Sequence, residues 1–487
     1  MLFTSIQFIL FFVPVYLIYW LLPCKRIKTQ NLLLLIASYY FYSCWDWRFL
    51  FLLLFSTCLD FFTGIRIYTS QNGNIKKFWF ILSLVINLGF LGVFKYYNFF
   101  IDSFSHLLDQ LGLPFSFKML SIILPVGISF YTFHGISYVV DIYKNRIKAE
   151  RNIIDYSLFV SFFPLLVAGP IERATHLLPQ IKKQRVFSYS NSVDGLRQIL
   201  WGLFKEIVIA DNCAQYADMI FDNYDTYNGV ILFVGAILFA IQIYGDFSGY
   251  SDIALGLARL LGFELLNNFK FPYFSRDIAE FWRRWHISLS SWFKDYVYIP
   301  LGGSKGSMWL RIKNTFIIFI LSGFWHGANW TFIIWGVIHA LFFLPILLLK
   351  LNRNHLEIVA ENSVFPSWKE FFQMLSTFVL VTFAWVFFRA NTFEIAINYL
   401  RKIFIDLFFF NYYISAMDFI SIHIGKSLVF LLLMFILMEW IGRKNKHVLE
   451  KLTIFNFFIP KFLFYLILIF LTIIFDTNNF KFVYFQF

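Results

Sequence analysis

The sequence predicts an all-α polytopic membrane protein, and three observations support this fold class. Hydrophobic residues make up 59% of the 487 residues and charged residues only 14%, whereas soluble domains average about 45–50% apolar and about 25% charged residues. The apolar excess extends along the whole chain and is not confined to one anchor. Apolar stretches also alternate with short basic loops, as expected for repeated membrane spans. A soluble enzyme, a disordered protein and a single-pass receptor are therefore excluded.

The expected elements are apolar segments, because a helix needs about 20 apolar residues to cross the hydrocarbon core. Candidate segments lie near 2–22, 31–45, 49–64, 78–97, 120–140, 154–170, 194–212, 229–247, 252–266, 314–326, 330–349, 371–388, 405–420, 427–442 and 457–475. Several are too short or too polar to span simply, so we expect about 11 transmembrane helices plus re-entrant and interfacial helices. We treat 1–487 as a single integral-membrane domain, with N-terminal helices at 1–120, a motif-bearing core at 121–350 and C-terminal helices at 351–487.

The basic residues predict the orientation of these segments. Lys plus Arg number 41 and Asp plus Glu 29, a formal net charge of +12. Such an excess belongs in cytoplasmic loops and near anionic lipid headgroups, and no basic arm suggests nucleic-acid binding. Basic loops follow the first, third and fifth segments, so we expect the N-terminus outside. The loop after 154–170 is also basic. We therefore expect 154–170, which contains Pro164 and Gly169, to enter and leave on one side and to form a wall of a site.

Histidines inside apolar segments are the first candidates for chemistry, because imidazole changes charge near neutral pH and can act as a base. Four of the nine histidines lie in polar loops, where we expect solvated side chains: His106, His176, His355 and His447. His423, between two apolar runs, stays ambiguous. The other four lie in or beside apolar segments: His134, His286, His326 and His339. We expect supporting roles for His134 and His339.

His326 is the strongest candidate, since it ends an apolar run at a break rich in Gly and Trp. Gly323 and Gly327 permit close approach of backbone or ligand. The flanking residues are candidates for binding a substrate or walling a dry pocket: Ser322, Trp325, Asn329 and Trp330. A core histidine bonded to a backbone carbonyl is the alternative interpretation.

His286 lies in an amphipathic, basic stretch at 281–292 that we interpret first as an interfacial helix anchored at the headgroups. Arg283 and Arg284, beside Trp285 and followed by Lys294, could also form a basic mouth that binds the phosphates of a cytoplasmic cofactor. Asp246 and Tyr250, in a cluster at 242–252, are further binding candidates. A helix break with capping carboxylates explains that cluster better than an ion site, so we expect no metal.

The motifs together resemble the membrane-bound O-acyltransferase (MBOAT) family, in its bacterial branch of alginate O-acetylase-like and peptidoglycan O-acetyltransferase-like proteins. The segments that carry the resemblance are LPVGISFYTFHGISYVVDIY at 124–143, FFPLLVAGPIERATHLLPQI at 162–181, QIYGDFSGYSDIALGLARLLGF at 242–263, NFKFPYFSRDIAEFWRRWHISLSSWFKDYVYIPLGG at 268–303, SGFWHGANWTFIIWGVIHA at 322–340 and, more weakly, WVFFRA at 385–390. The resemblance implies a helical funnel around a tunnel that an acyl donor enters from the cytoplasm. It places the family's intramembrane histidine at His326 and its second histidine at His286.

The resemblance further implies an O-acetyltransferase of the bacterial inner membrane, with acetyl-CoA as donor and no tightly bound cofactor. His326 would be the general base, kept neutral by burial, and Asn329 or Trp325 would face the developing oxyanion. The implied partners are a periplasmic or membrane-anchored O-acetyltransferase, a polysaccharide acceptor and membrane lipids. Peptidoglycan, alginate, cellulose or another exopolysaccharide stay open as acceptors, as does D-alanine transfer to teichoic acid. The rival interpretations are a transporter or conduit for an acyl donor with no chemistry of its own and, more weakly, a scaffold subunit.

Overall fold

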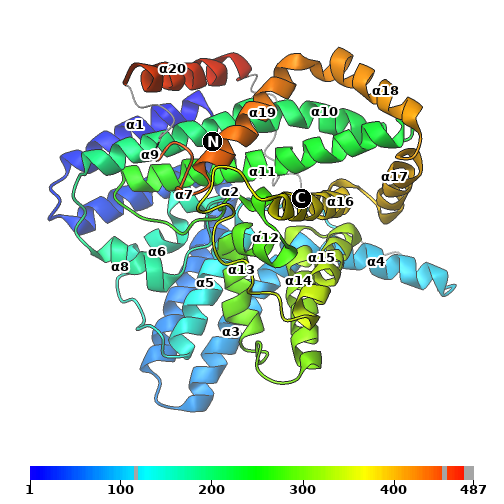
Figure 1. The fold of residues 1–487 in the computed structure, drawn as a ribbon. Helices are drawn as coiled ribbons and strands as arrows, with labels where there is room; N and C mark the ends of the chain where they lie inside the picture. The colour runs from blue at the N-terminus through cyan, green and yellow to red at the C-terminus, as the bar shows by residue number, and fades with distance from the viewer. Residues whose placement is uncertain (114–118, 452–457, 477–487) are drawn as a thin grey trace. The chain divides into compact units, whose positions relative to one another are not determined.

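The computed structural model describes residues 1–113, 119–451 and 458–476, and every regular element in this part of the chain is a helix (Figure 1). The predicted all-α class is confirmed. Within these described ranges, six helices or continuous helical runs are long and apolar enough to cross a membrane: α2 (Ile27–Thr69), α3 through α4 (Gly73–Gln110), α11 (Gly229–Leu260), α15 (Trp330–Leu348), α16 (Trp368–Arg389) and α18 through α19 (Phe410–Gly442). Two shorter apolar helices are α1 (Ile6–Leu21) and α20 (Phe458–Phe475). The chain is therefore a multi-pass membrane protein, and the expected number of about 11 spans stays a prediction.

The chain divides into two compact units, which we describe separately. The first comprises residues 1–192 and 257–266 and contains α1 to α4, α5 (Ile128–Tyr143), α6 (Ile153–Ser161), α7 (Phe163–Leu166) and α8 (Ala174–Lys182). Polar side chains join its helices: Asp60 of α2 accepts hydrogen bonds from Ser83 and Asn87 of α3, both at 2.7 Å. The predicted segments 31–45 and 49–64 both lie in α2, which is bent at Asp46.

The segment 154–170 is interrupted, as the sequence predicts. Helix α6 ends at Ser161, the short α7 follows, and residues 167–173 are not helical. A nine-residue helix is only about 14 Å long and cannot cross a core of about 30 Å. That segment 154–170 enters and leaves on the same side of the membrane stays a prediction.

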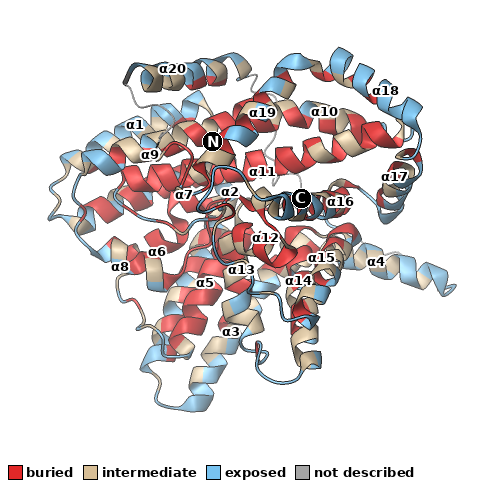
Figure 2. Cartoon of the chain, in the orientation of Figure 1, coloured by how far each residue is buried: buried red, intermediate tan, exposed pale blue. Residues whose placement is uncertain are grey.

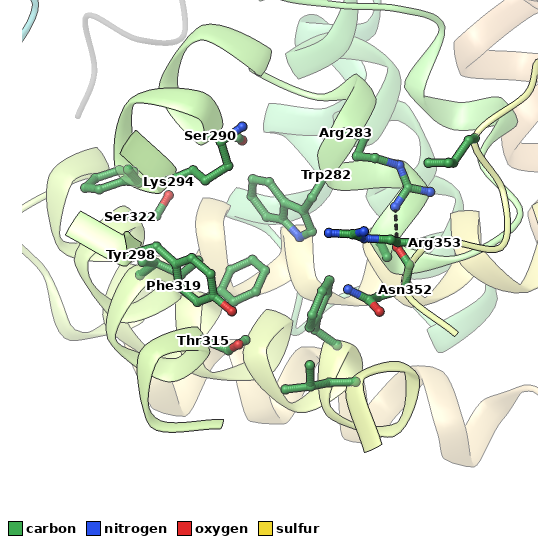
Figure 3. Close-up of a pocket in the computed structure, with 16 residues that line it drawn as sticks. Trp282, Arg283, Ser290, Lys294, Tyr298, Thr315, Phe319, Ser322, Asn352 and Arg353 are labelled. Carbon is green, nitrogen blue, oxygen red and sulfur yellow. Dashed lines mark hydrogen bonds between the residues drawn. The ribbon is translucent and has the colours of Figure 1, made fainter. Parts of the chain in front are cut away.

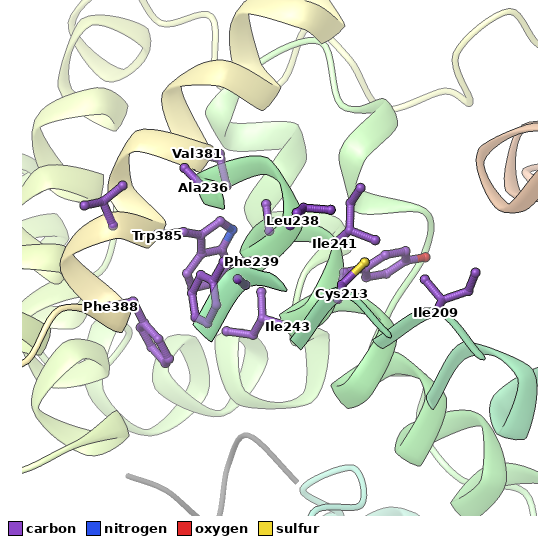
Figure 4. Close-up of a cluster of buried hydrophobic side chains, with 14 of the residues drawn as sticks. Ile209, Cys213, Ala236, Leu238, Phe239, Ile241, Ile243, Val381, Trp385 and Phe388 are labelled. Carbon is purple, nitrogen blue, oxygen red and sulfur yellow. The ribbon is translucent and has the colours of Figure 1, made fainter. Parts of the chain in front are cut away.

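The second unit comprises residues 193–256 and 267–487. Most of α9 (Tyr189–Leu203) falls in it, followed by η2 (Phe204–Ala210), α10 (Asp211–Asp222), α11, η3 (Pro272–Phe274), α12 (Ile278–Arg284), α13 (Ile287–Phe293), η4 (Lys294–Tyr298), α14 (Met308–His326), α15, α16, α17 (Phe393–Asp406), α18 (Phe410–Phe419), η5 (Ile420–Ile424), α19 (Gly425–Gly442) and α20. Its core contains four fully buried tryptophans, Trp201, Trp285, Trp335 and Trp385. Figure 4 shows Trp385 and Phe388 of α16 within this apolar cluster.

Helix α11 corrects one expectation. It runs unbroken from Gly229 to Leu260, so there is no helix break at Asp246 or Asp252. Its glycines serve close packing instead: a Cβ at Gly249 would lie 2.8 Å from the Gly202 carbonyl oxygen of α9. Figure 2 shows α11 buried along most of its length. Asp252 is held by an ion pair of 2.6 Å with the buried Lys205, so it does not cap a helix.

Candidate functional site

His326 sits at the end of α14, where this helix packs closely against α15. Glycine makes the packing possible, because a Cβ at Gly323 would collide with the Phe332 carbonyl and one at Gly336 with the Phe319 carbonyl. Helix α14 stops at His326 because Gly327 adopts an extended conformation, and α15 then begins at its N-cap, Asn329. The histidine is thus held at a rigid helical corner.

Aromatic rings surround His326, which is 5% exposed. The centroid of its ring lies 5.0 Å from that of Trp325, 5.2 Å from Trp335 and 5.2 Å from Phe388. Trp325 therefore lies beside His326, and its predicted role as the wall of a dry pocket stays a prediction. Trp330 is 55% exposed at the start of α15.

His286 occupies a break between α12 and α13, in a left-handed backbone conformation with φ 43° and ψ 54°. Such a conformation costs a non-glycine residue about 1–3 kcal/mol and persists only where its surroundings impose it. Two hydrogen bonds do so here: Ile287 N–H donates to the Asn268 carbonyl at 2.9 Å, and Lys270 N–H donates to the Arg284 carbonyl at 3.0 Å. The stretch 281–292, expected as one interfacial helix, instead belongs to two helices, because packing buries Trp285 and His286 completely and breaks the helix there; its position at the headgroups stays a prediction.

The two histidines, 40 positions apart in the sequence, lie together. Their ring centroids are 6.4 Å apart with planes inclined at 60°, and Trp325 lies 5.8 Å from His286. Both ring nitrogens of His286 are buried without a hydrogen-bond partner among the described residues. His286 lies outside the six long apolar helices, and burial lowers the pKa of its ring to about 3, so the ring is neutral near pH 7. An unsatisfied buried imidazole costs about 1–3 kcal/mol, and a hydrogen bond with a ligand would remove this cost.

A pocket of about 460 Å³ lies in the second unit (Figure 3), and neither histidine lines it. Its lining includes Ser290, four residues after His286, and Ser322, four residues before His326. Residues four apart in a helix share a face, so Ser322 and His326 are one turn apart on α14. The pocket therefore ends one helical turn before His326 along this face of α14.

Cations surround the rest of the pocket. Arg283, Lys294 and Arg353 line it. Arg283 donates to the carbonyls of Asn352, at 2.8 Å, and His355, at 2.7 Å, and so holds the loop after α15. Lys294 and Arg353 form no ion pair or side-chain hydrogen bond with the described residues, and Figure 3 shows the Arg353 guanidinium extending toward Trp282.

The remaining predicted binding residues lie elsewhere. Arg284 does not line the pocket, because its guanidinium is buried against Glu280 at 2.6 Å. Trp285 is core, with its ring 5.0 Å from Trp385. Both ends of the Asn329 amide are used, since Oδ1 accepts from Thr331 N–H and Nδ2 donates to the Asn391 carbonyl, each at 3.0 Å. Asp246 and Tyr250 are buried on α11 and do not line the pocket. The binding roles assigned to these residues stay predictions.

The structure also identifies lining residues that the sequence analysis missed. Trp282 and Phe319 form the apolar side of the pocket, and Arg353 supplies a cation from the loop after α15. The only signal in the sequence was the basic run that ends at Arg353. His339, expected to support the site, accepts a hydrogen bond from the Trp282 indole at 3.2 Å.

Three other histidines have structural partners. His447 is 2% exposed and lies 3.0 Å from Asp194, so the expected solvated role is wrong. His176 pairs with Glu172 at 2.7 Å, a contact that raises the pKa of its ring. His134, in the first unit, accepts from the Glu172 backbone N–H at 3.1 Å.

Comparison with known proteins adds independent findings. A model of the membrane-bound O-acyltransferase family matches residues 145–391, a range that contains His286, His326 and the whole pocket lining. A probable alginate O-acetylase from Pseudomonas aeruginosa is 41% identical over 397 residues, which cover 81% of this chain and 73% of the relative. A peptidoglycan O-acetyltransferase from Helicobacter pylori is 36% identical over 430 residues, with 82% and 79% covered. A teichoic acid D-alanyltransferase from Bacillus subtilis is 29% identical over 230 residues, with 44% and 57% covered.

Proposed function

We propose a specific reaction for this chain, which belongs to the membrane-bound O-acyltransferase family and is an acyltransferase. In this proposal it takes acetyl groups from cytoplasmic acetyl-CoA and transfers them for O-acetylation of a cell-envelope polysaccharide. The relatives named for alginate and peptidoglycan support an acetyl group and a polysaccharide acceptor. All of the relatives compared above are named as transferases or acetylases. A conduit without chemistry of its own is therefore disfavoured.

The observation that carries the proposal is the neighbouring pair His286 and His326, each four residues from a serine that lines the pocket. An acyl donor in this pocket would bring its thioester past Ser322, toward the next turn of α14. Buried, aromatic surroundings exclude water, which would otherwise hydrolyse the thioester. The same surroundings favour the neutral imidazole that a general base requires.

In the proposed reaction, His326 is the general base. Its neutral ring takes the proton of an acceptor hydroxyl while the hydroxyl oxygen attacks the thioester carbonyl carbon. The new C–O bond forms, the C–S bond breaks, and the imidazolium returns its proton to the leaving thiolate, which yields an ester and free CoA. His286 positions the donor or the acceptor, since its ring nitrogens are available for a hydrogen bond.

The cations of the pocket suit the phosphates of CoA. Lys294 and Arg353 are exposed at the pocket and form no ion pairs with the described residues, and arginine binds phosphate through two parallel hydrogen bonds. Positive charge also favours the cytoplasmic side, where acyl-CoA is made. We place the protein in the bacterial inner membrane. A periplasmic or membrane-anchored partner then completes transfer to the polysaccharide.

The proposal is tested by replacing His326 with Ala in protein purified into nanodiscs. We expect acetyl-CoA binding, measured by calorimetry, to stay near wild type, while CoA release in the presence of a surrogate alcohol falls about 10²- to 10⁴-fold, since a general base acts mainly in the transition state. His106→Ala, at an exposed histidine of α4, is the matched control and should change neither. Undiminished turnover in His326→Ala would remove His326 as base. Absence of CoA release in wild type would remove the proposed donor.

A further inference from the structure

A two-layered wall of rings separates the pocket from the core of the second unit. Trp282 and Phe319 form the layer that lines the pocket, with ring centroids 5.2 Å apart. Trp335 and His339 form the layer behind, 5.7 Å and 5.0 Å from Trp282. We call these four residues the aromatic wall. Trp335 also contacts His326 at 5.2 Å, so the wall reaches the proposed base.

The aromatic wall is held in place by a hydrogen bond and by backbone packing. The Trp282 indole N–H donates to His339 Nδ1 at 3.2 Å, which fixes the orientation of the tryptophan ring. Phe319 and Trp335 come from α14 and α15, whose backbones meet at Gly323 and Gly336. These helices cannot move closer, and the packing that glycine permits leaves little room for Phe319 to shift.

The rings behind the wall are closely packed among the residues that the structure describes. Trp335 packs against Trp385 at 5.5 Å and against Phe388 at 5.3 Å, and both belong to the apolar core of Figure 4. Ser322, which lines the pocket, lies one helical turn before His326, about 6 Å along the axis of α14. An acyl group that passes from the pocket toward His326 therefore has to pass the rings of the wall, and each further carbon would have to displace more of these rings.

We propose that the aromatic wall restricts the acyl donor to short acyl groups, with Trp282 and Phe319 as specificity-determining residues and His339 as the positioning residue that orients Trp282. This inference rests on the proposed function. It deepens that function by naming the feature of the donor that the protein selects, namely the length of its acyl chain. Because one methylene in a packed pocket changes kcat/KM by about 10- to 200-fold, the selection should be steep.

The test is CoA release from acetyl-, butyryl- and hexanoyl-CoA by the protein in nanodiscs. Wild type should prefer acetyl-CoA over hexanoyl-CoA at least about 100-fold in kcat/KM. Phe319→Ala should narrow this preference at least about tenfold, mainly by admitting the longer donors. The matched control is Leu347→Ala, which removes an apolar side chain from the same pocket outside the wall and should keep the wild-type preference. If Phe319→Ala fails to fold, Phe319→Leu serves in its place.

Two variants of His339 separate positioning from bulk packing. His339→Asn retains an acceptor for the Trp282 indole and should keep the acetyl preference, whereas His339→Leu removes the acceptor and should lose it. Equal rates for all donors in wild type, or equal preferences in Phe319→Ala and Leu347→Ala, would overturn the inference while leaving the proposed function standing. Wild type that releases no CoA from any donor would overturn the proposed function, and the inference with it.

Discussion

Arg284 provides the sharpest test of how far the structure revises the sequence-based site. The sequence analysis assigns Arg284 to the phosphates of the donor. In the structure, Glu280 lies between two arginines, with Arg284 at 2.6 Å and Arg276 at 3.0 Å, and all three side chains are at most 8% exposed. Arg276 also reaches Glu357 at 3.2 Å and Glu370 at 3.4 Å. We therefore expect Arg284 to stabilise the fold around His286 and to contribute little to donor binding.

The geometry predicts how much three substitutions lower the free energy of unfolding. Arg284→Gln leaves Glu280 paired with Arg276, so the free energy of unfolding should fall by about 1.5–3 kcal/mol, the value of hydrogen bonds to a charged group. Glu280→Gln leaves the buried Arg284 without an ion-pair partner among the described residues, while Arg276 keeps Glu357 and Glu370, and should lower the free energy of unfolding by about 3–5 kcal/mol. The double substitution also removes the Arg284 guanidinium, so it should be less destabilising than the sum of the single changes, as expected for residues in contact.

Unfolding temperature in detergent and acetyl-CoA affinity are the two measurements. The unfolding temperature should fall in the order wild type, Arg284→Gln, Glu280→Gln, and the affinity of the folded fraction of Arg284→Gln should stay within about threefold of wild type, a change below about 1 kcal/mol. An Arg284→Gln protein that unfolds like wild type but binds acetyl-CoA more than tenfold more weakly would refute this reasoning. It would restore Arg284 as a phosphate ligand.

Two further predictions concern charge. The double variant Lys294→Gln, Arg353→Gln removes the two pocket cations that form no ion pair or side-chain hydrogen bond with the described residues. At about 1 kcal/mol for each exposed charge, acetyl-CoA affinity should fall about 25-fold while the unfolding temperature stays unchanged. Unchanged affinity would contradict the proposed binding of the CoA phosphates by these cations. The hydrogen bond with Glu172 raises the pKa of His176 in the folded protein. This pair therefore stabilises the fold fully below the ordinary pKa of histidine, and the stabilisation is lost as pH rises through the folded pKa. It should amount to less than about 1 kcal/mol, because the His176 side chain is 38% exposed. His176→Gln should abolish the resulting small fall in unfolding temperature between about pH 6 and about pH 9, and an equal fall in both proteins would exclude the pair as its source.

Much of the site could be predicted because its signals are local in the sequence. A run of apolar residues that ends in glycine, tryptophan and histidine marks His326 without any structure, because an ionisable group in such a run is costly to bury. Ser322 and Trp325 follow from it, being within one helical turn. The break within 154–170 was equally visible from its prolines and glycine. By contrast, Gly249 and Asp246 suggested a break in α11 that does not exist, since glycine serves close helix packing there as well as helix ends.

The sequence by itself determined that this protein is helical and membrane-embedded and which two histidines to examine, because composition and motif are properties of neighbouring residues. Only the tertiary structure decided that His286 and His326 lie 6.4 Å apart and that adjacent Arg283 and Arg284 face different partners. It also decided that Phe319 and Trp282, from separate helices, close one pocket. These outcomes depend on how helices distant in the sequence pack. Packing is set by the shape and volume of all contacting side chains together, which no local pattern records.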